Sequence, residues 1–164
     1  AGDNPAANSY QSVEDLRVYA RLRGVELGSK TDPECEVILI KAMDYLESQY
    51  KRFKGEKTNI GQSLQWPRSE VWDVEQSNSL LPNNEIPRLM EYAQLALAIE
   101  AINGDLQPNA TTSNKGQVLR EKIGPIDITY SAETPKQNFV EALAKPAALL
   151  APIYKRNGLV MVRG

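Results

Sequence analysis

The sequence predicts a mainly α-helical protein, a helical bundle of about four helices with a small β-hairpin and extended terminal arms. Apolar residues recur at helical spacing in several long segments, whereas one later segment alternates apolar and polar residues around a Gly-Pro turn. With 164 residues, 41% of them hydrophobic, the chain is long enough for one domain with a proper core. We therefore expect a single helical domain over residues 12–150.

The first two helices are predicted from their capping residues. Residues 1–11 are small and polar, which favours a flexible N-terminal arm. Ser12 then opens the first helix, with Asp15 in the reciprocal capping position. The second helix is expected to begin with Asp32 as its cap and Pro33 in the first helical position. Its apolar stripe consists of Leu39, Met43, Leu46 and Tyr50.

The rest of the domain is expected to hold a long loop, two more helices and the hairpin. Residues 55–86 keep no period, so we expect an ordered loop pinned by aromatic residues. Pro87 starts a third helix, which is apolar on nearly all sides and is therefore predicted to be central. The alternating pattern predicts the hairpin over 118–130. The last helix, over 137–150, is expected to be kinked or ended at Pro146.

Composition limits the possible classes of function. A net charge of -2 and a pI near 5.3 argue against general attraction to nucleic acid, so any such binding must depend on a local patch. The chain has no histidine and one cysteine, which excludes a Ser-His-Asp set, a histidine-ligated metal and an internal disulfide. Phosphate-binding glycine motifs do not occur. We therefore expect no enzyme and no cofactor. The apolar runs are too short for a membrane span, so a cytosolic protein is expected.

The densest mixture of aromatic and basic residues follows the second helix, and it is the first candidate binding site. These side chains could stack bases and neutralise the phosphates of nucleic acid. The same residues are also typical of a helix end whose lysines extend into solvent, and the Trp-Pro pair is also typical of a loop anchored on the core. The residues of this DNA-facing or interface site are Tyr50, Lys51, Arg52, Phe53, Lys54, Trp66 and Arg68.

The second hypothesis is an assembly protein that uses its terminal arms, its apolar helix and its hairpin to contact other copies and a partner. The C-terminal tail, residues 151–164, is basic and apolar, which suggests insertion into another protein. The candidate interface residues in it are Lys155, Arg156, Leu159, Val160, Met161, Val162 and Arg163.

Nearly the whole chain carries a resemblance to a known family. The ordered stretches are SYQSVEDLRVYARLRG, ILIKAMDYLESQYKRFKGEK, GQSLQWPRSEV, IPRLMEYAQLALAI, REKIGPIDITYS and ALLAPI with a terminal VRG. They resemble a tailed-bacteriophage family labelled "putative DnaT-like ssDNA-binding protein". Its members look like the head–tail connector, or adaptor, proteins of the virion neck.

This resemblance implies a structural virion protein that forms a homo-oligomeric ring, expected to be a dodecamer, between portal and tail. Its partners would be the phage portal protein, a tail or stopper protein and the DNA passing through the channel. The tail around Lys155, Arg156 and Arg163 would reach the portal, and Arg120 and Lys122 on the hairpin would face subunits or DNA. The protein would lie in the virion neck, and in the host cytoplasm before assembly. The alternative implied by the family label is a single-stranded-DNA-binding, DnaT-like replication protein.

Overall fold

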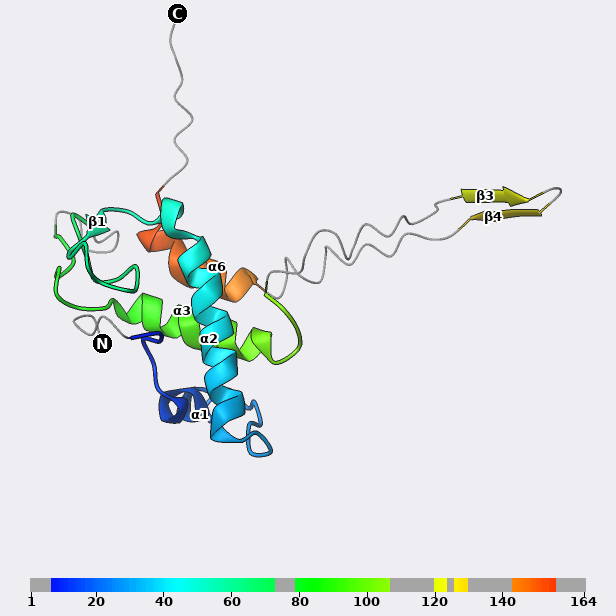
Figure 1. Ribbon diagram of the computed structural model, residues 1–164, viewed down its shortest axis with the longest axis horizontal. Coiled ribbons are helices and arrows are strands. Elements are labelled where there is room, and N and C mark those ends of the chain that lie inside the picture. The colour runs from blue at the N-terminus through cyan, green and yellow to red at the C-terminus, as the bar shows by residue number, and fades with distance from the viewer. Residues whose placement is uncertain (1–6, 73–78, 107–119, 124–125, 130–142, 156–164) are drawn as a thin grey trace, which may run out of the picture.

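The structure is a helical bundle with two small antiparallel sheets (Figure 1). It is a computed structural model that describes residues 7–72, 79–106, 120–123, 126–129 and 143–155. Within these residues there are four α-helices, which confirms the predicted mainly α class with a small hairpin. They are α1 (Val13–Arg21), α2 (Asp32–Ser48), α3 (Arg88–Ala101) and α6 (Ala144–Leu150). None of the helices in this described part combines the length and apolarity that a membrane crossing requires.

The predicted cap of α1 is confirmed, whereas the cap of α2 lies one residue earlier than predicted. Ser12 and Asp15 form the expected reciprocal box, with each side chain accepting from the other residue's backbone N–H. At α2 the box is formed by Thr31 and Glu34, whose Oε2 accepts from the Thr31 backbone N–H at 2.7 Å. Asp32 is thereby left free to form an ion pair with another part of the chain, on α1.

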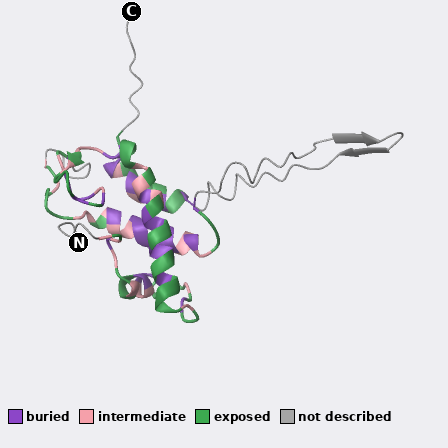
Figure 2. Cartoon of the chain, in the orientation of Figure 1, coloured by how far each residue is buried: buried purple, intermediate pink, exposed green. Residues whose placement is uncertain are grey.

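Helix α3 is the centre of the bundle, as its apolar sequence predicts. Eight of its 14 residues are buried, and it packs against α1, α2 and α6. Figure 2 shows this buried stretch where α2 crosses α3. Large fully buried side chains come from all four helices. They include Leu16 of α1, Leu46 of α2, Met90 and Leu97 of α3 and Leu150 of α6.

The chain before α1 differs from the flexible arm that was expected for residues 1–11. Gln94, fully buried on α3, accepts from the backbone N–H groups of Tyr10 and Gln11, both at 3.1 Å. The Tyr10 hydroxyl accepts from the backbone N–H of Trp66 at 3.1 Å. These contacts hold residues 7–11 between α3 and the long loop, while residues 1–6 lie outside the described part.

The loop over 55–86 contains a small sheet of its own. Strand β1 (Glu56–Lys57) pairs antiparallel with β2 (Arg68–Ser69), and a cis Trp66–Pro67 bond precedes β2. Gly55, just before β1, has a φ of +63°, and a Cβ there would lie 1.9 Å from the carbonyl oxygen of Ser69. Only glycine fits this close approach between the two chain segments.

The predicted hairpin is confirmed, and the last helix begins later than predicted. Strands β3 (Arg120–Ile123) and β4 (Ile126–Thr129) pair antiparallel, with Ile123 opposite Ile126 at the turn. Pro146 neither ends nor kinks a helix, because it lies in the first turn of α6, where a backbone N–H has no helical partner. The expected earlier part of this helix, 137–142, lies outside the described residues. The short 3-10 helix η2 (Ala151–Ile153) follows α6.

Candidate nucleic-acid interface

Two segments about a hundred positions apart in the sequence pair beside the end of α2. The backbone N–H of Lys54 donates to the Ile153 carbonyl at 3.0 Å, and that of Lys155 donates to the Arg52 carbonyl at 2.7 Å. Phe53 and Tyr154 thus form an isolated antiparallel bridge. The pairing fixes the segment after η2 against the segment after α2.

This pairing brings basic residues from the two segments close to one another. Within 50–55 and 153–155 there are four lysine and arginine side chains and no acidic side chain. Tyr50 is 51% exposed at the start of the short 3-10 helix η1 (Tyr50–Arg52), so one aromatic ring is accessible beside the charges. We call this group the basic surface, and it consists of Tyr50, Lys51, Arg52, Lys54 and Lys155.

Three of the four cations of the basic surface lie against an aromatic ring or a backbone carbonyl. The guanidinium carbon of Arg52 lies 4.3 Å from the centre of the Tyr154 ring, a cation–π distance. Burial raises the pKa of Tyr154 to about 12, so its hydroxyl stays neutral at physiological pH. Lys54 Nζ donates to the Pro152 carbonyl at 2.6 Å, which leaves this ammonium with further donors for a ligand. Lys51 Nζ lies 5.6 Å from the Tyr50 ring.

Two aromatic rings that were predicted to face DNA instead form the floor beneath this surface, and that part of the prediction is corrected. Phe53 and Trp66 are both 0% exposed, and their rings meet edge to face with centroids 6.2 Å apart. Side chains buried to this degree cannot stack with bases. Phenylalanine and tryptophan rings can either stack with bases or pack in a core, and in this fold both rings pack in the core.

Arg68 was also predicted to face DNA, and it too is corrected to a structural role. It is 7% exposed, and its guanidinium donates to the carbonyl oxygens of Lys54 at 2.8 Å and Gly55 at 2.6 Å. Burial lowers the pKa of Arg68 from its ordinary value. Its donors therefore support the backbone that carries the basic surface.

The remaining candidate residues are distributed between a strand and the undescribed end of the chain. Arg120 and Lys122 lie on β3, opposite Thr129 and Asp127 respectively. Arg156 and the predicted interface residues over 159–163 lie outside the described residues. Lys155, predicted as an interface residue in the tail, is instead part of the basic surface.

Sequence reasoning missed one exposed aromatic side chain. Trp72 is 54% exposed beyond β2, where its backbone forms an isolated bridge with Leu80. No periodic pattern surrounds it, so the only signal in the sequence is the presence of a tryptophan in the long loop. It lines an apolar groove at the start of α3.

Comparison with known proteins identifies the family. Residues 2–164 match a family model described as "Putative DnaT-like ssDNA binding protein". No curated protein and no solved structure matches the chain significantly. The family description corrects the connector prediction, because it names binding of single-stranded DNA; the virion, neck and portal-binding roles are therefore withdrawn. The family model covers nearly the whole chain, and the chain belongs to this DnaT-like family.

Proposed function

We propose that the protein binds single-stranded DNA through the basic surface and is not an enzyme. The observation that carries the proposal is the pairing of Lys155 with Arg52, which joins two basic segments beside the exposed Tyr50. The family description supports the same ligand. The rest of the chain carries excess negative charge, so binding is confined to this surface.

The chemistry of the surface matches the two parts of a nucleotide. Lysine and arginine side chains neutralise phosphates and release the counterions that surround the strand. An exposed aromatic ring stacks with a base, and such stacking tolerates any sequence because every base has a π face. Tyr50 provides that ring next to Lys51, so one nucleotide can place its base on the tyrosine and its phosphate on the lysine.

Exposure of Tyr50 also favours single strands over duplex DNA. The faces of bases are covered by their neighbours in a duplex, whereas they are available in a single strand. Phosphate contacts alone would not distinguish the two forms. We therefore expect the full chain to prefer an oligothymidine to a duplex of equal length.

The proposal is tested by charge reversal with a matched control. Lys51→Glu and Lys155→Glu each reverse a charge of the basic surface, whereas Lys41→Glu reverses an exposed charge on α2 away from it. The readout is fluorescence anisotropy of a labelled oligothymidine at low salt. Each of the first two variants is expected to weaken binding several-fold more than Lys41→Glu, although all three change the net charge equally. Equal losses in the three variants, or no binding by the wild type, would refute the proposal.

A further inference from the structure

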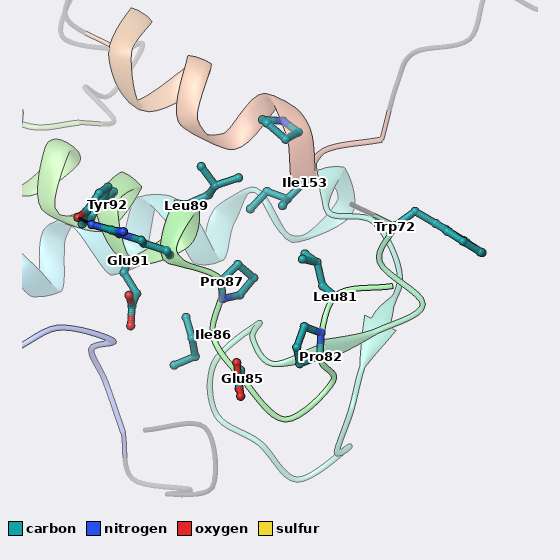
Figure 3. A pocket seen from close by; sticks show the side chains of 12 residues that line it. Trp72, Leu81, Pro82, Glu85, Ile86, Pro87, Leu89, Glu91, Tyr92 and Ile153 are labelled. Carbon is teal, nitrogen blue, oxygen red and sulfur yellow. Dashed lines mark hydrogen bonds between the residues drawn. The ribbon is translucent and has the colours of Figure 1, made fainter. Parts of the chain in front are cut away.

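A second surface feature is an apolar groove of about 600 Å3 that runs along the start of α3 (Figure 3). Pro82, Pro87 and Leu89 line it together with Ile153 of η2. In Figure 3, Tyr92 and Trp72 lie at opposite ends. Its volume lies in the range of ligand-binding pockets.

Two carboxyl groups also line this apolar groove. Glu85 is exposed, and Glu91 lies on α3 with its pKa raised by burial. Arg88 also lines the groove and donates to the Tyr92 hydroxyl while keeping its charge, so with Glu85 and Glu91 ionised these three side chains carry a net charge of about −1. An occupant that combines apolar side chains with a positive charge therefore suits this groove.

We propose that the groove holds the chain's own segment Leu159–Val162. This segment has four consecutive apolar side chains, Arg163 follows it, and residues 156–163 contain no acidic side chain. The described chain reaches Lys155, two residues beyond the groove-lining Ile153. Leu159 can lie up to about 14 Å from Lys155, at ~3.5 Å per residue.

Residues 156–158, which join Lys155 to Leu159, favour docking of the chain's own segment over docking of the same segment from a second copy. Asn157 and Gly158 form a dipeptide typical of tight reversals, which would return the chain toward the groove. A segment tethered this closely has an effective concentration of the order of millimolar. A second copy must reach that concentration in solution before it competes. The Glu85 and Glu91 carboxylates provide the complementary charge for Arg163.

The test uses the accessibility of Trp72 in the full chain. The protein has two tryptophans, and Trp66 is 0% exposed, so acrylamide quenching that is lost in a Trp72→Phe background reports Trp72 alone. Docking of the segment shields Trp72 in the wild type. Val160→Asp and Met161→Asp place a charge on successive side chains, which point in opposite directions in an extended chain. At least one of them is expected to raise Trp72 quenching several-fold, whereas the control Ser29→Asp, at an exposed residue between α1 and α2, leaves it unchanged.

Three results would overturn the proposal. The first is a wild-type Trp72 that acrylamide quenches as strongly as a free tryptophan side chain in solution, because the groove would then be empty. The second is a wild type whose Trp72 becomes exposed on dilution as its mass falls, because the occupant would then come from a second copy. The third is shielding that neither variant removes. Since the wild-type measurement alone decides the first two, the test does not depend on either variant folding, nor on whether the protein binds DNA.

Discussion

The substitution Gln94→Leu tests how the segment before α1 is held. Gln94 is fully buried, and its Oε1 accepts from the N–H groups of Tyr10 and Gln11, both at 3.1 Å. Its Nε2 donates to Ser9 Oγ at 2.7 Å. Leucine has a similar size but leaves these partners without their bonds, and a buried orphaned group costs about 1–3 kcal/mol. With the Tyr10 N–H buried and the Gln11 N–H half-buried, we expect a loss of about 2–4 kcal/mol.

The assay is urea unfolding followed by circular dichroism, with Gln49→Leu as the control. Gln49 lies half-exposed after α2, and its side-chain hydrogen bonds to Ser48 and Arg52 are open to solvent, so the same substitution is expected to cost less than about 1 kcal/mol. Because the Tyr10 hydroxyl accepts from the backbone N–H of Trp66, Gln94→Leu is also expected to loosen the loop under the basic surface. Equal stabilities of the two variants would show that the Gln94 hydrogen bonds do not hold the segment before α1.

Two further predictions concern the backbone and a helix cap. Gly55→Ala should lower the free energy of unfolding in urea by at least ~2 kcal/mol more than Gly24→Ala does. Both glycines have a positive φ, which costs alanine about 1–2 kcal/mol at either position. Only at Gly55 would the added Cβ also meet the Ser69 carbonyl. A similar loss at both would contradict the close approach. Hydrogen bonds from the hydroxyl and the backbone N–H of Ser12 lower the pKa of Asp15. These bonds therefore stabilise the folded protein fully above the ordinary aspartate pKa, and that stabilisation is lost as pH falls through the lowered pKa. Asp15→Asn should therefore flatten the acid limb of a stability–pH profile, and an unchanged limb would contradict it.

Local signals were sufficient for most of the helical fold. The capping box of Ser12, the apolarity of α3 and the alternation around the Gly-Pro turn each depend on a few neighbouring residues, and each prediction is confirmed. The cap of α2 was misplaced by one residue because Thr31 and Asp32 are both good caps, and sequence alone does not choose between them. Pro146 allows a helix start as well as a helix end, so it could not place the boundary of α6.

Long-range contacts account for what sequence reasoning missed. Tyr10 and Gln94 are 84 positions apart, so nothing in the polar N-terminal sequence indicates that it is anchored. Likewise, the pairing of Lys155 with Arg52 has no periodic signal, and it moved a residue predicted to lie in a tail into the basic surface. Phe53 and Trp66 are buried whereas Tyr50 is exposed, and this difference depends on the packing of the long loop.

The salt dependence of single-stranded DNA binding by the full chain shows whether the basic surface is the DNA-binding site. The basic surface holds four cations, and each phosphate contact contributes ~0.7 to the slope for single strands, so log K should fall against log salt with a slope of about −3. Tyr50→Ala should lower the affinity by about 1–3 kcal/mol while leaving this slope unchanged, because it removes stacking and no charge. A slope near zero, or a Tyr50→Ala variant that binds as the wild type does, would show that the basic surface does not bind single-stranded DNA in this way.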